Sequence, residues 1–276
     1  MSVLTESRVT RSQVDNTDLL KATAILLVAI DHFAIYFVDT QPLENWLEVL
    51  GRLAAPVFFF LIGFATSRTV PISWLVLGCI LMVFGAWGDD WDWGPGSILF
   101  SFALFRFMRP YIRKIVCESW IGTVVLIAAL IAASAIPEIS HYVEPLALDG
   151  ASGWLWALLG LCQREYVEAQ DSDKRYFALS RWLILPITVS FFWLQTAETW
   201  SEEHTEFTTI QLGALAVSFT ILALVLVRFK RGPSRWQPRS MAAHSLRFLG
   251  HNTLEIYAAQ LIISPIVLKI WPQVVF

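Results

Sequence analysis

The stretch Asp18–Val38 reads DLLKATAILLVAIDHFAIYFV and is almost entirely apolar. A helix needs about 20 such residues to cross the hydrocarbon layer of a membrane. Similar stretches recur along the 276-residue chain, in which 56% of the residues are hydrophobic and 16% are charged. Each stretch must be helical, because lipid offers the backbone no hydrogen-bonding partner. The sequence therefore predicts an all-α polytopic membrane protein.

About nine transmembrane helices are predicted, in a single domain over residues 18–276 that follows a polar cytoplasmic segment at 1–17. The first apolar stretch has no small-residue cleavage site after it, which favours a retained signal anchor. The spans are expected near residues 18–38, 51–69, 71–87, 97–112, 119–137, 145–163, 177–196, 208–228 and 247–270.

The distribution of basic residues predicts the orientation, because cytoplasmic loops are enriched in Lys and Arg. With the N-terminus inside and nine spans, eighteen of the twenty Lys and Arg residues fall in inner segments. Only Arg52 and Lys269 fall outside. The predicted topology thus has the N-terminus in the cytoplasm and the C-terminus outside, and the expected location is a bacterial inner (cytoplasmic) membrane.

Composition also limits the kinds of partner. Cys79, Cys117 and Cys162 have no metal-ligand or disulfide-framework spacing, so no metal is expected. The basic inner loops are typical of a topology signal and of contact with anionic membrane lipids. Nucleic acid is not expected as a partner.

The first predicted helix carries ionisable residues, which are costly in lipid and mark functional sites. Lys21 and His32 are 11 residues apart, or three helical turns plus about 20°, so they share one face about 16 Å apart. Asp18 lies about 40° from the same line. A long, thin ligand with an anionic head, such as coenzyme A, would fit along this stripe.

His32 is the candidate general base, because an imidazole exchanges protons near neutral pH. Asp31 points roughly 100° away from it and would act on it through the local electric field rather than by orienting the ring. The alternative is that His32 only packs against a neighbouring helix through a hydrogen bond.

Three motifs resemble the transmembrane acyltransferase superfamily, which includes the acyltransferase-three proteins. Asp18-x-x-Lys21-x10-His32 is similar to the first-helix signature, and Asp31-His32 is closest to the TraX-like branch. Gly51–Phe64 resembles the second-helix motif of the TraX-like and heparan-α-glucosaminide N-acetyltransferase branches. Leu249–Tyr257 is similar to the segment that opens the last helix. These families often have a His three residues after that Tyr, where this chain has Gln260, so no catalytic residue is assigned there.

The resemblance implies transfer of an acyl group, usually acetyl, from cytoplasmic acyl-CoA (acetyl-CoA) to an extracytoplasmic acceptor. The acceptor would be a hydroxyl or amine of a surface polysaccharide, a glycan or a protein N-terminus. Arg52 would stabilise the oxyanion or bind an anionic acceptor, unless it is only an interfacial arginine.

The inner cations offer sites for the phosphates of CoA, with topology signal alone as the alternative. These cations are Arg106, Arg109, Arg113 and Lys114. The residues expected to bind the cofactor as a whole are Lys21, Asp18, Arg109 and Arg113.

Two other functions stay open at this point. Asp31 and His32 inside a span also suit a proton-coupled transporter, although no pair of related, interrupted halves is present. A non-catalytic membrane subunit of an envelope assembly is the third possibility. A homodimer or an envelope partner is compatible with each of these functions.

Overall fold

The structure is a computed structural model that describes residues 14–38, 40, 43–67, 69–85, 94–136, 150–203, 208–234 and 240–270. Helices make up its regular structure, apart from an isolated bridge between Asp15 and Pro233. The helices are α1 (Asn16–Phe37), α2 (Leu43–Gly51), α3 (Ala54–Phe64), α4 (Ile72–Gly85), α5 (Gly94–Glu118), α6 (Trp120–Ala135), α8 (Gly150–Glu168), α9 (Asp171–Glu203), α10 (Thr209–Leu226), α11 (Ser240–His251) and α12 (Thr253–Ile270).

The predicted all-α class is confirmed. Within the described residues, four helical stretches are long and apolar enough to cross a membrane: Asn16–Phe37, Leu43–Phe64, Asp173–Ala197 and Thr209–Leu226. Shorter apolar helices occupy Ile72–Met82, Trp120–Ala135 and Thr253–Val267. These lengths and compositions indicate an integral membrane protein, while the count of nine spans stays a prediction.

Two predicted spans have wrong bounds. The second was expected at 51–69, but the apolar stretch is Leu43–Phe64 and is broken between α2 and α3. Arg52 therefore lies at a break within the stretch and not at its start. The last span, expected at 247–270, is two helices separated at Asn252, whose side chain bonds back to the Phe248 carbonyl at 2.8 Å. Asparagine favours helix ends because its side chain competes for backbone groups in this way.

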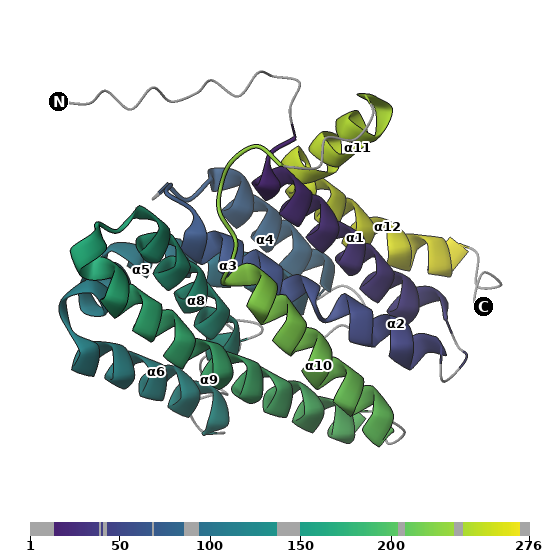
Figure 1. Cartoon of the computed structure of the whole chain (residues 1–276). Helices are drawn as coiled ribbons and strands as arrows, with labels where there is room; N and C mark the ends of the chain where they lie inside the picture. The colour runs from purple at the N-terminus through teal and green to yellow at the C-terminus, as the bar shows by residue number, and fades with distance from the viewer. Residues whose placement is uncertain are drawn as a thin grey trace.

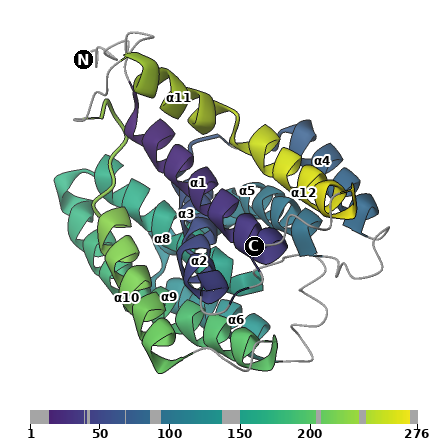
Figure 2. The same ribbon diagram turned by 90° about the vertical axis from the view of Figure 1, so that its right-hand side faces the viewer.

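In both ribbon views α3 runs through the middle of the molecule (Figures 1 and 2). The helices α1, α4, α11 and α12 lie on one side of it, and α6, α8, α9 and α10 lie on the other. The side chains of α3 are nearly all apolar, and those of Phe59 and Phe60 are fully buried. An apolar helix without a polar face is suited to this central place.

The contact between α3 and α8 depends on glycine. A methyl group added at Gly63 would collide with the carbonyl oxygen of Ala157, and one at Gly160 would collide with that of Phe60. The missing side chains let the two backbones approach closely, as small residues do at helix interfaces in membranes. The core continues beyond α8, where Trp156 packs against Phe192 and Phe219.

The start of α1 is tied to a segment far along the chain. The Asp15 side chain accepts a hydrogen bond from the backbone N–H of Thr17 and caps the helix. The backbone N–H of Asn16 donates to the Gly232 carbonyl at 3.0 Å, and that of Ser234 donates to the Val14 carbonyl at 2.9 Å. These bonds fix the position of the helix that carries Lys21 and His32.

Candidate functional site: a polar cavity between the helices

The helices α1 and α3 run in opposite directions along each other. Ala24 packs with Val57 and Leu61, whereas Val28, further along α1, packs with Ala54 at the start of α3. Lys21 consequently lies near the end of α3, and His32 lies near the break that precedes α3. The break thus brings Arg52 to the level of the imidazole.

One large cavity, with a volume of about 1010 Å³, is lined by residues from both ends of the antiparallel pair of α1 and α3. Its wall includes Lys21 at one end and Asp31, His32 and Arg52 further along. The predicted stripe on α1 therefore faces a single continuous space. The catalytic roles assigned to these residues stay predictions.

His32 is surrounded by side chains from three parts of the fold. Its ring centroid lies 6.3 Å from that of Tyr36 on α1 and 6.0 Å from that of Tyr257 on α12. Arg52, at the α2–α3 break, and Gln260 of α12 interact electrostatically with the imidazole. The last helix, to which the sequence assigned no role, is therefore part of this environment.

The carboxylates of α1 have different neighbours. Asp31 is on the cavity wall and packs against Gly51, where an added methyl group would collide with its side chain. Asp18 faces α11, with its Oδ1 3.8 Å from Nδ1 of the exposed His251. Among the described wall residues of the cavity Asp18 does not appear, so the geometry does not support its predicted place beside the ligand.

Basic side chains gather where α1 begins and α3 ends. We call Lys21, Arg106, Arg164 and Arg231 the basic mouth, because all four are on the cavity wall. Arg106 donates to the Thr69 carbonyl at 3.1 Å, and Arg164 donates to the Ala65 carbonyl at 3.0 Å. Backbone carbonyls just after α3 thus orient two of the guanidinium groups.

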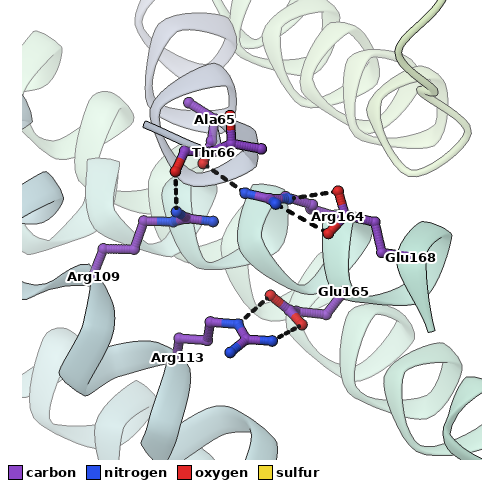
Figure 3. Close-up of polar contacts among 7 residues, drawn as sticks. All are labelled: Ala65, Thr66, Arg109, Arg113, Arg164, Glu165 and Glu168. Carbon is purple, nitrogen blue, oxygen red and sulfur yellow. Dashed lines mark hydrogen bonds and ion pairs between the residues drawn. The ribbon is translucent and has the colours of Figure 1, made fainter. Parts of the chain in front are cut away.

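The mouth also carries negative charge. Arg164 donates two hydrogen bonds to the carboxylate of Glu168, from Nε at 2.9 Å and from Nη2 at 3.0 Å (Figure 3). Glu168 is on the cavity wall as well. An anionic ligand that binds here would compete with this carboxylate for Arg164.

Arg109 and Arg113 lie outside the large cavity. Arg109 is 4% exposed and donates to the Thr66 carbonyl at 3.2 Å, and Arg113 forms two bonds with Glu165, at 2.6 and 2.9 Å (Figure 3). The hydrogen bond and the charge of Glu165 raise the pKa of the Arg113 guanidinium above its ordinary value. Both arginines line a small adjoining cavity of about 120 Å³, whose wall shares Thr66, Arg164 and Glu168 with the large one. The geometry therefore favours Arg106 and Arg164 over them as phosphate ligands.

The Arg113–Glu165 pair gives a prediction. Glu165 has a side chain that is 8% exposed, so Arg113→Gln should leave a carboxylate poorly solvated and destabilise the protein by about 2 kcal/mol. Adding Glu165→Gln should recover most of that loss. Thermal unfolding of both variants in detergent measures the effect. A role for Arg113 in ligand binding would instead leave the double variant with a raised KM for acetyl-CoA.

Neutral polar groups line another part of the cavity. Ser134 of α6, Ser152 of α8, and Gln195 and Thr196 of α9 are on its wall, together with the ring of Phe192. Ser152 is 2% exposed, and Thr196 bonds to the Phe192 carbonyl at 2.8 Å. This part offers hydroxyl and amide groups from helices without a functional motif in the sequence, because single Ser, Thr and Gln residues in apolar stretches have no recognisable spacing.

The fold and the cavity define a class of protein. The chain is an all-helical protein whose long apolar helices indicate an integral membrane protein, with a large polar cavity between the helices. The model of the TraX protein family matches residues 16–161, more than half of the chain, and the chain belongs to this family.

The comparisons with curated proteins and with solved structures match a short part of the chain or none of it. An uncharacterized protein of Rickettsia prowazekii (strain Madrid E) is 28% identical over 76 residues, which are 28% of this chain and 29% of the relative. The chain therefore matches less than a third of the length of that curated relative. No solved structure matches the chain.

Proposed function

We propose that the protein is a membrane-embedded acyltransferase that moves an acyl group, most simply acetyl, from cytoplasmic acyl-CoA to a hydroxyl or amine of an extracytoplasmic acceptor. The observation that carries this proposal is the single cavity with the basic mouth at one end and His32 further along. Membership of the TraX family is compatible with this proposal but does not define a reaction. The proposed reaction therefore rests on the residues that line the cavity.

The donor would bind with its charged end in the basic mouth. Arginine forms two parallel hydrogen bonds with a phosphate, and lysine binds phosphate as a compact positive charge. Lys21 and His32 are separated by about 16 Å of helix, over which the extended arm of acyl-CoA would lie. The thioester would then reach the level of His32 and Arg52.

The chemistry requires a base and a group that stabilises negative charge. His32 would take the proton of the acceptor hydroxyl or amine while the freed electron pair attacks the thioester carbonyl. Arg52 would stabilise the oxyanion that forms. The C–S bond then breaks, and CoA leaves as a thiolate that takes up a proton. Asp31 would favour the positive charge that His32 carries between these steps.

The predicted topology gives this reaction a direction. With nine spans and an inner N-terminus, the basic mouth would face the cytoplasm, where CoA is found. The neutral part of the cavity around Ser134, Ser152 and Gln195 would then admit the acceptor from the other side. The bacterial inner membrane is the expected location.

The test uses the full chain in nanodiscs with radiolabelled acetyl-CoA and solubilised envelope material. Release of CoA together with label on a polysaccharide or protein supports the proposal, and mass spectrometry identifies the acceptor. Proton flux in liposomes without any requirement for CoA would instead identify a transporter. Failure to bind acetyl-CoA, with stable co-purification of an envelope protein, would identify a non-catalytic subunit.

Lys21 provides the prediction that concerns donor binding. Lys21→Ala should raise KM for acetyl-CoA roughly tenfold to a hundredfold and leave kcat within about twofold, because a hydrogen bond to a charged group is worth about 1.5–3 kcal/mol. Lys230→Ala is the matched control, since Lys230 is exposed and lies off the cavity wall among the described residues. Equal KM values for the two variants would contradict the assignment of Lys21.

A further inference from the structure

The indole of Trp74 lies beside the basic mouth. Trp74 is near the start of α4 and lines the large cavity together with Arg106 of α5. The guanidinium carbon of Arg106 lies 4.3 Å from the centroid of the indole, close enough for a cation–π contact. Two flat groups, an indole and a guanidinium, thus lie one over the other on the cavity wall. We call them the Trp74–Arg106 stack.

Neighbouring aromatic rings hold the indole in place. Phe102 of α5 packs against Trp74, with ring centroids 6.1 Å apart and an angle of 62° between the rings. Phe102 in turn packs edge-to-face against the fully buried Phe59 of α3, at 4.8 Å. This chain of rings reaches from the core to the cavity, so the fold sets the position of Trp74 before a ligand binds.

Arg106 is held from another direction. One of its terminal nitrogens, Nη1, donates to the Thr69 carbonyl at 3.1 Å. Its Nε is buried and has no hydrogen-bond partner among the described residues. The N–H donors of a guanidinium lie in its own plane, so the face of Arg106 can stack while its edge bonds an anion.

This combination of groups suits a nucleotide. Nucleobases stack on aromatic side chains and on the plane of an arginine. The phosphates of the same nucleotide need cations nearby, and Lys21 and Arg164 of the basic mouth line the same cavity. A phosphate without a base would use these cations and leave the Trp74–Arg106 stack unused.

We infer that the Trp74–Arg106 stack binds the purine base of the acyl donor. The site would then select a thioester that carries a nucleotide over the same thioester on a pantetheine arm alone. The base would lie on the stack, the phosphates would bond Lys21 and Arg164, and the arm would run towards His32. The identity of the ligand as an acyl donor rests on the proposed function, whereas the preference for a base rests on the stack.

The closing experiment compares two ligands that differ only in the base. They are adenosine 3′,5′-bisphosphate and its abasic analogue, in which hydrogen replaces the base and both phosphates remain. Equilibrium dialysis measures binding of each to the full chain in nanodiscs. Wild-type protein should bind the adenosine compound roughly 5- to 150-fold more tightly, the range for stacking of one base on an aromatic ring. Trp74→Leu should bind both compounds equally.

Kinetics test the same subsite with the whole donor. Trp74→Leu should raise KM for acetyl-CoA by a similar factor, leave kcat within about twofold, and leave KM for acetyl-pantetheine unchanged. Trp74→Phe keeps a ring for stacking and should behave nearly as wild type. Trp182→Leu is the matched control and should behave as wild type. Trp182 is an exposed indole of α9 that also has an arginine nearby, Arg181 at 5.9 Å, but it is not on the described cavity wall.

The outcomes separate the two proposals. Equal affinity of wild-type protein for the two compounds, or no binding of either, overturns the base subsite. An unchanged preference for the adenosine compound in folded Trp74→Leu also overturns it, and Trp74 is then an interfacial anchor. If Trp74→Leu does not fold, Arg106→Lys, which keeps the charge and loses the flat face, takes its place and should weaken the preference. A preference that depends on Trp74, in a protein that never transfers acetyl, supports the base subsite and overturns the proposed acyltransferase activity.

Discussion

Replacing His32 by glutamine should abolish acetyl transfer while acetyl-CoA still binds. Glutamine keeps a polar side chain of similar size on the cavity wall but cannot take a proton near neutral pH. A positioned general base contributes about 10²- to 10⁴-fold to a rate, so kcat should fall by at least 100-fold. Turnover of labelled acetyl-CoA and equilibrium binding of the same molecule are measured on one preparation in nanodiscs.

The matched control is His244→Gln. His244 is exposed on α11 and is absent from the described cavity wall, so its replacement should change neither turnover nor binding. An equal, small effect of both substitutions would remove His32 from the role of base. If His32→Gln loses binding of acetyl-CoA and His244→Gln does not, the imidazole binds acetyl-CoA rather than acting as the general base.

The second large effect is expected at the contact between α3 and α8. Gly63→Ala and Gly160→Ala each place a methyl group against a backbone carbonyl of the facing helix. Helix backbones cannot move aside as a flexible side chain does, so each substitution should destabilise the protein by about 1–3 kcal/mol, and leucine at either position by more. Thermal unfolding and size-exclusion profiles in detergent record the loss.

Gly213→Ala provides the control for helical glycines in general. Nothing lies within 4 Å of a methyl group added at Gly213 of α10. Alanine is favoured over glycine inside a helix by about 1 kcal/mol, so this variant should be as stable as wild type or slightly more stable. If Gly63→Ala matched Gly213→Ala in stability, the close approach of α3 and α8 would be disproved.

The fold class followed from the sequence because lipid leaves an apolar backbone segment only the helix to adopt. Boundaries were less predictable. Hydropathy does not register the break between α2 and α3, because the residues on both sides of Arg52 are apolar. The close contact at Gly63 and Gly160 was not predicted either, since it depends on which two helices face each other.

The stripe from Lys21 to His32 was predictable, because positions on one helix are fixed by its period. The proximity of Arg52 to His32 was also predicted, although from a span with wrong bounds. Arg113 stays a predicted ligand residue, and its pairing with Glu165, which lies 52 residues away, was not predictable from the sequence. Gln260 was seen only as a departure from a family pattern, since nothing in the sequence shows that α12 packs against His32.

The bonds that fasten the start of α1 have a consequence for synthesis. Val14 and Asn16 are held by Ser234 and Gly232, so these bonds cannot form until more than four-fifths of the chain has been translated. Protein segments are made from the N-terminus onward, and early ones wait for late partners. The first helix is therefore synthesised early, but the hydrogen bonds that fix its start form late. In a ribosome-bound chain that stops before residue 232, the start of α1 should lack these bonds.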